Sequence, residues 1–192
     1  SLPISEPMKP NRVLRTGLLP FLLVLAFCCL TGGNGMAAPR TFWVDSRTGD
    51  DLQDGTSPRR AWRTLERLSR CSLQPGDVVS FARGSRFDGC LEVRASGSAA
   101  APIRFTSYGR KQLPAPLFTN SDTTGFGNCI RLWGDYLHVG QLAFAHTLAE
   151  IPQRHRIASF TDMWQLGTVV VDSSARHCVI SGWDLLDCGV GI

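Results

Sequence analysis

The sequence lacks the short motifs that identify several large enzyme classes. It has no GxxxxGK[ST] phosphate loop, no HExxH zinc motif, no GxSxG nucleophile turn and no CxxC pair. Each of these motifs holds reactive groups at a fixed spacing, so its absence argues against the enzymes that depend on it.

Strong charge of one sign is also missing. The formal net charge is +4 over 192 residues, which is too small to indicate nucleic-acid binding. Lysine is scarce, and Lys111 is the only lysine after the N-terminal leader. Arginine forks suit carboxylates, so an acidic sugar is a compatible ligand, although a compositional bias of the genome explains the arginines equally well.

No apolar run is long enough to cross a membrane. Gly17–Leu30 contains Pro20 and has 14 residues, whereas a spanning helix needs about 20. Basic residues precede this run and the small-residue segment GNGMAA follows it, as in a secretory signal peptide. We expect a signal peptide region over 1–38, with residues 1–7 of no assigned role, cleavage after Ala37 or Ala38, and a secreted or periplasmic product without a membrane span.

The remaining chain, 39–192, has short alternating apolar runs instead of helical periodicity. Strands are expected at Thr41–Val44, Asp77–Phe81, Cys90–Val93 and Ile103–Thr106, because Gly, Pro, Ser or Asp residues bound each run. One exception is a helix that we expect from Ser57 and Pro58 onward, with an apolar stripe formed by Ala61, Trp62, Leu65 and Leu68.

Two later segments are versions of one repeating unit. The first places Ile130, Leu132, Val139, Leu142 and Phe144 inward, and the second does the same with Val169, Val171, Ile180 and Leu185. No capping segment precedes Ile192, and a repeat fold needs a cap at each end. We therefore expect 39–192 to be the N-terminal part of a domain that is incomplete at its C-terminus.

The order PGD-strand-RG-strand-SG-APIRF-YG resembles the first turns of the pectate-lyase-like superfamily, from about Thr41 to the end of the chain. The resemblance implies an all-β, right-handed parallel β-helix (solenoid) with the expected helix as its N-terminal cap. It also implies a polysaccharide partner, bound in a groove along one outer face.

Two functions remain open. The first is an exported carbohydrate-active protein, a polysaccharide lyase or glycoside hydrolase acting on a polysaccharide that is acidic or neutral. The alternative is a non-catalytic β-helix used for adhesion or surface carbohydrate binding. Asp172, Asp184 and Asp187 are candidate catalytic carboxylates, because glycosidases use two of them; the alternative is that they only form turns. Enzyme status is left open.

The loop 148–165 is the expected substrate-binding segment, since it interrupts an otherwise regular repeat. Its Arg154, His155, Arg156 and Trp164 combine positive charge with a flat apolar surface. The alternative is a loop whose tryptophan packs on the coil.

Metal binding and disulfide bonding are the last expectations. Calcium is a possible cofactor at Asp45, Asp50, Asp51 and Asp54, since hard cations prefer several carboxylate oxygens; turn formation and helix capping are the competing explanation. Cys71 and Cys90 flank the first repeat strand and form the favoured disulfide in an exported chain. The others, Cys129, Cys178 and Cys188, are expected to be buried in the coil.

Overall fold

The computed structural model describes residues 38–121, 127–145 and 167–186. The chain separates into two units, Ser1–Ala37 and Ala38–Ile192, and every described residue belongs to the second. The expected signal peptide therefore lies outside the described residues. Within the described part, no helix is long and apolar enough to cross a membrane.

Short strands account for nearly all of the regular structure. In chain order the elements are β1 (Thr41–Val44), η1 (Pro58–Arg60), α2 (Leu65–Ser69), β2 (Val78–Ala82), β3 (Arg86–Asp88), β4 (Leu91–Val93), β5 (Ile103–Tyr108), β6 (Leu117–Thr119), β7 (Ile130–Leu132), β8 (Leu137–Gly140), β9 (Ala143–Ala145), β10 (Val169–Val171), β11 (Val179–Ser181) and β12 (Asp184–Leu186). The four strands expected from the first part of the sequence are present within a few residues of their predicted bounds.

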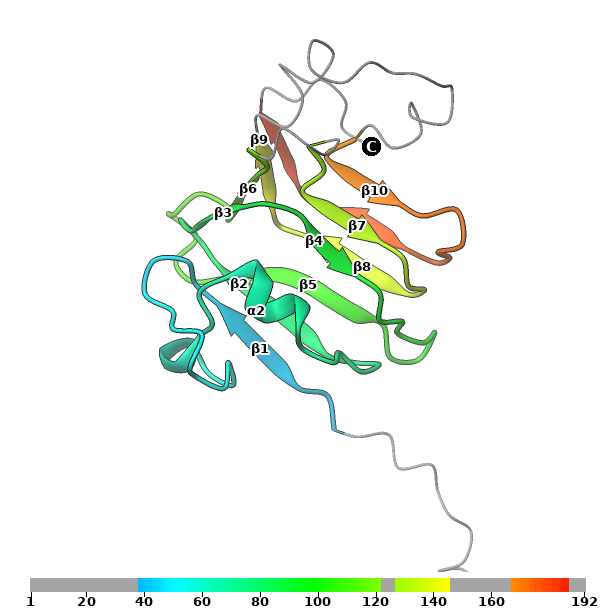
Figure 1. Ribbon diagram of the computed structural model, residues 1–192, viewed down its shortest axis with the longest axis horizontal. Coiled ribbons are helices and arrows are strands. Elements are labelled where there is room, and N and C mark those ends of the chain that lie inside the picture. Colours follow the sequence, from blue (N-terminus) through cyan, green and yellow to red (C-terminus); the bar gives the residue numbers. More distant parts are fainter. Residues whose placement is uncertain (1–37, 122–126, 146–166, 187–192) are drawn as a thin grey trace, which may run out of the picture. The chain divides into compact units, whose positions relative to one another are not determined.

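These strands form three parallel sheets (Figure 1). Sheet A has the order β1-β2-β5-β8-β11, sheet B has β12-β9-β6-β3, and sheet C has β10-β7-β4. The chain passes from sheet A to sheet B to sheet C and back again. A strand inside a sheet therefore pairs with the equivalent strands of the coils before and after it, and a strand at the end of a sheet pairs with one of them. This winding makes the described part a β-helix solenoid, as the sequence predicts.

Alternation along each strand fills the interior of the coils. In β4 the two aliphatic residues, Leu91 and Val93, are buried, while Glu92 between them is exposed. Equivalent aromatic residues of successive coils pack on one another inside: the ring centroids of Phe87 and Phe118 are 5.2 Å apart, and those of Phe118 and Phe144 are 5.7 Å apart. Stacking of like residues in register holds the coils together without long helices.

The expected helix from Ser57 is much shorter than predicted. Residues 58–60 form one 3₁₀ turn, Ala61 is extended, and Trp62 bridges to Val44 in parallel-strand geometry. The α-helix is limited to α2, whose first N–H groups are capped by the Thr64 hydroxyl accepting from the Arg67 N–H. The prediction failed because the same apolar residues are also compatible with an extended segment that buries one face. The helix α2 packs against β4.

Two residues predicted to point into the core are exposed. Val171 has 37% and Leu185 has 45% of its surface accessible, in contrast to their partners Leu132 and Phe144 in the preceding coil, which are fully buried. Both lie on β10 and β12, the terminal strands in the described parts of sheets C and B. Inward orientation buries a side chain only when a further coil covers it.

The disulfide predicted between Cys71 and Cys90 is absent, and both residues are free cysteines. Cys71 packs at the margin of the core cluster, and its charged neighbours include Arg40 and Arg67. Cys90 precedes Leu91 and so faces the outer side of β4, where its charged neighbours are Glu92 and Arg131. Alternation along β4 thus turns Cys90 away from the core cluster, at whose margin Cys71 packs. Cys129 is buried as expected, and Cys178 is half-buried.

Candidate functional site

The outer face of sheet C carries a group of interacting charged and aromatic side chains. Outward positions on β4 and β7 are in register, with Glu92 opposite Arg131. One residue beyond each strand, the backbone N–H of Trp133 donates to the Val93 carbonyl at 2.8 Å, and that of Asp172 donates to the Leu132 carbonyl at 2.8 Å. The pairing thus extends one residue further. We name the outward set Glu92, Arg94, Arg131, Trp133 and Asp172 the sheet C face.

Trp133 is the centre of this face. The Arg94 guanidinium carbon lies 5.0 Å from the centre of the indole ring, and that of Arg131 lies 5.3 Å away. Both contacts are within the range of cation–π attraction. The indole Nε1 and the Arg131 Nε are buried and have no hydrogen-bond acceptor among the described residues. Two N–H donors of the sheet C face are therefore buried without an acceptor in the described part of the chain.

Carboxylates flank the aromatic centre. The Glu92 carboxylate forms an ion pair with the Arg94 guanidinium at 2.8 Å. Asp172 accepts hydrogen bonds from the Ser174 hydroxyl and N–H, which together with the nearby Arg131 charge hold the pKa of Asp172 below its ordinary value. Burial and the Glu92 charge raise the pKa of the Cys90 thiol to about 11. At neutral pH Asp172 is thus ionised and Cys90 is a neutral thiol, which makes Cys90 a poor nucleophile.

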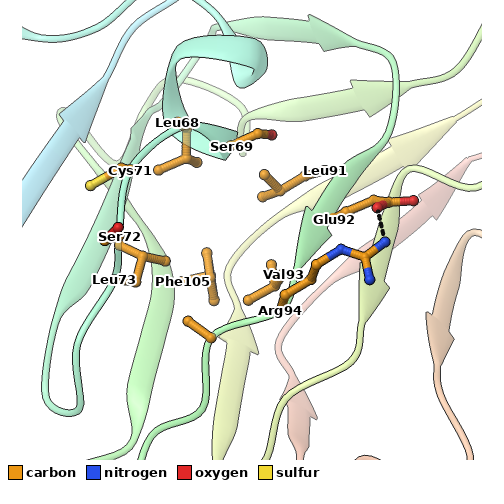
Figure 2. Close-up of a pocket in the computed structure, with 11 residues that line it drawn as sticks. Leu68, Ser69, Cys71, Ser72, Leu73, Leu91, Glu92, Val93, Arg94 and Phe105 are labelled. Atoms are coloured by element: carbon orange, nitrogen blue, oxygen red, sulfur yellow. Dashed lines mark hydrogen bonds and ion pairs between the residues drawn. The ribbon is translucent and has the colours of Figure 1, made fainter.

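A cavity of about 450 Å³ opens between α2 and β4, beside the sheet C face. Figure 2 shows its apolar lining and, on one side, the Glu92–Arg94 ion pair. The lining consists of Leu68, Leu73, Leu91, Val93, Ala95 and Phe105, with Ser69, Cys71 and Ser72. Because Glu92 and Arg94 belong both to this cavity and to the sheet C face, the two form one continuous surface.

The catalytic candidates from the sequence do not converge. Asp172 lies on the sheet C face, whereas Asp184 begins β12 on sheet B. Asp187 lies outside the described residues, as does the expected binding segment with Arg154, His155, Arg156 and Trp164. Asp172 and Asp184 thus belong to different sheets, and a catalytic role for these carboxylates stays a prediction.

The four loop aspartates are engaged by protein donors. Asp45 accepts from the hydroxyls of Thr48 at 2.8 Å and Ser85 at 2.9 Å, and Asp51 accepts from the Arg63 N–H at 2.7 Å. Asp50 accepts from the Leu52 N–H and Asp54 from the Thr56 N–H in short turns. In the described segments no three His, Cys, Asp or Glu side chains lie close enough to hold a metal ion. The calcium hypothesis for this loop therefore has no carboxylate cluster to support it.

Sequence reasoning missed most of the sheet C face. The signal was present as a two-residue alternation, because Glu92 and Arg94 interleave with Leu91 and Val93. The same alternation recurs at Ile130–Trp133 in the next coil. Only the register between coils shows that these outward residues are neighbours.

Comparison with known proteins gives the following relatives. No protein-family model matches the chain. A lacto-N-biosidase of Bifidobacterium longum subsp. longum is 34% identical over 89 residues, which are 44% of this chain and 6% of that protein. The crystal structure of the GH136 lacto-N-biosidase from Eubacterium ramulus matches with a TM-score of 0.55 and 19% identity, over 79% of this chain and 28% of that one. An alginate lyase from Paenibacillus sp. str. FPU-7 matches with a TM-score of 0.51 and 20% identity, over 78% and 38%.

The chain spans well under half the length of each of these proteins. At these identities the structural likeness concerns the fold. The three parallel sheets and the two structural matches lead to one conclusion: the described chain has the parallel β-helix fold found in carbohydrate-active enzymes.

Proposed function

We propose that this chain is part of an exported carbohydrate-active enzyme and that its sheet C face binds the polysaccharide. The observation that carries the proposal is Trp133 between Arg94 and Arg131, with two buried N–H donors that have no acceptor among the described residues. Leaving a donor buried and unpaired costs about 1–3 kcal/mol. A sugar that displaces Arg94 from the indole ring would supply the acceptor through a hydroxyl or carboxylate. The apolar face of that sugar would then pack against the indole.

Hydrolysis of a glycosidic bond is favoured over elimination. The curated relative with detectable sequence identity is a lacto-N-biosidase. The face itself supports binding more than chemistry, since Glu92 is already paired with Arg94 and Asp172 with Ser174. An ionised Asp172 is unsuited to protonating a leaving group. The pair of catalytic carboxylates is thus expected outside the described residues.

The same proposal includes the right-handed winding of the coils, export by the leader and a capping role for α2. Leu65 and Leu68 of α2 are buried, and the helix contacts β4 of the first complete coil. A short amphipathic helix at that point would shield the core from water.

Binding to immobilised glycans tests the site. The chain is offered lacto-N-bioside, alginate oligosaccharides and an unrelated neutral glucan, and the dissociation constants are measured for Trp133→Ala and for a matched control. We expect Trp133→Ala to weaken binding about tenfold, which corresponds to the roughly 1.4 kcal/mol of an aromatic contact.

Trp43→Ala is the control, because Trp43 is also partly exposed but lies on sheet A, against Tyr108. Equal affinity of the wild type and Trp133→Ala for every glycan that binds would show that the sheet C face is not the binding site.

A further inference from the structure

A second groove lies on a different face, over sheet B. A hollow of about 660 Å³ runs between the loop 111–115 and β12, and a smaller one of about 190 Å³ continues it over β3. Both hollows are lined by Pro114, Ala115, Ala143 and Leu186, so they form a single elongated depression across the coils. We name it the sheet B groove. An elongated depression suits a linear chain better than a small ion.

The wall of this groove is fixed by hydrogen bonds. The Arg83 Nε donates to the Leu113 carbonyl at 3.0 Å, and its Nη1 donates to the Ser107 hydroxyl at 3.2 Å. The Gly84 N–H donates to the Pro114 carbonyl at 2.9 Å. The loop is therefore held against the turn between β2 and β3, and the groove is formed before any ligand arrives.

Positive charge predominates along the groove. Its lining includes the cations Arg83, Arg86 and Lys111 and the single carboxylate Asp184. None of the three cations forms an ion pair with a described carboxylate.

Two further acids come close to the groove. Asp88 interacts electrostatically with Arg86, but its oxygens accept hydrogen bonds from Thr119 and Ser121. Asp45 is similarly occupied by Thr48 and Ser85. The groove thus keeps positive charge that no carboxylate in the described part neutralises through an ion pair.

The floor of the groove is apolar. Ala143 and Leu117 are adjacent in register on β9 and β6, and the small Ala143 side chain leaves the hollow open. Trp183 lies at one end, held edge-to-face against the buried ring of Phe144 with centroids 5.6 Å apart. An apolar floor with a flat indole and a cationic rim matches a chain of sugar rings that carry negative groups.

We propose that the sheet B groove binds a segment of an anionic polysaccharide, with Arg86 and Lys111 contacting its carboxylate or sulfate groups. Arg83 contributes charge while it anchors the wall. The groove lies on a separate sheet from Glu92 and Trp133, so the proposal is independent of the function assigned to the sheet C face. It provides a second contact along which an acidic chain would be held.

Calorimetry at low and moderate salt tests the proposal with three hexasaccharides: an oligogalacturonate, a sulfated oligosaccharide and a neutral oligoglucan. The groove variant is Arg86→Gln with Lys111→Gln. The control, Arg59→Gln with Arg104→Gln, removes the same charge from exposed positions on other surfaces. We expect the groove variant to weaken anionic binding roughly tenfold, the control to change it less than twofold, and added salt to reduce the difference.

The outcomes separate the alternatives. The anion that binds the wild type more tightly, and loses affinity in the groove variant, identifies the ligand as a uronate or a sulfate ester. Equal losses in the two double variants, binding of neither anionic probe, or equally tight binding of the neutral probe would overturn the proposal. Trp43→Ala serves as a further control, because Trp43 lies on β1 of sheet A, and it should leave anionic binding unchanged.

Discussion

Replacing Trp62 by alanine should remove a large share of the stability of the fold. Trp62 is 1% exposed, stacks on Phe42 with centroids 5.0 Å apart, and donates from its Nε1 to the Gln53 carbonyl at 2.9 Å. The Arg67 guanidinium covers the same ring at 4.4 Å. The residue thus ties β1, the aspartate-rich loop and α2 together.

The expected loss in the free energy of unfolding is about 3–5 kcal/mol, as for other large aromatic truncations in a core. Roughly 1 kcal/mol of that reflects the hydrogen bond to Gln53. Trp62→Phe retains the stacking on Phe42 but loses this hydrogen bond. Its loss in the free energy of unfolding should therefore lie near the lower end of that range. Since small domains have only about 5–15 kcal/mol in total, the alanine variant should unfold at a clearly lower urea concentration.

Urea unfolding followed by far-UV circular dichroism measures the change, because that signal does not depend on the tryptophan removed. Midpoints are compared at a common slope. Trp43→Ala is the matched control: Trp43 is partly exposed and makes one edge contact with Tyr108 at 4.6 Å, so its loss should cost about 1 kcal/mol. A cost for Trp62→Ala that is no larger than that of the control would show that Trp62 does not tie these elements together.

Two further predictions concern acid stability and close packing. Burial by itself would raise the pKa of Asp77, but hydrogen bonds and the ion pair with Arg40 lower it overall. The ionised Asp77 therefore stabilises the fold at neutral pH. That stabilisation is lost as the pH falls through the lowered pKa. Urea midpoints between pH 7 and 3 should fall more steeply in the wild type than in Asp77→Asn, and parallel curves would contradict this. At Gly134 an added Cβ would lie 2.0 Å from the Ala95 carbonyl oxygen, so Gly134→Ala should cost about 2 kcal/mol; an unchanged melting temperature would show that this turn can shift.

Local sequence signals predicted the strands well. The pattern around Leu91 and Val93 alternates with polar residues, and Pro and Gly residues mark the turns, so the positions of strands followed from chain-local chemistry. The similarity of the segments beginning at Ile130 and Val169 also predicted a repeat, and the register between β7 and β10 pairs these two residues.

Signals that are ambiguous at the local level gave wrong predictions. The stripe Ala61–Leu68 fits a helix, yet Trp62 is extended because β1 offers it a parallel partner at Val44. The proximity of Cys71 and Cys90 in the sequence suggested a disulfide, yet the alternation at β4 turns Cys90 outward. In both cases a long-range contact decided between local alternatives.

Chain-local chemistry accounts for the coil, because it specifies where the strands lie, which face of each strand is apolar, and that the unit repeats. Which outward residues become neighbours depends on how successive coils pack. Glu92 and Arg131 are far apart in the chain, and their pairing across β4 and β7 depends on how many residues the intervening turns contain. A shift of one residue in that register would turn Trp133 inward and dissolve the sheet C face. The spacing of the coils, which local chemistry does not encode, thus creates both candidate binding surfaces.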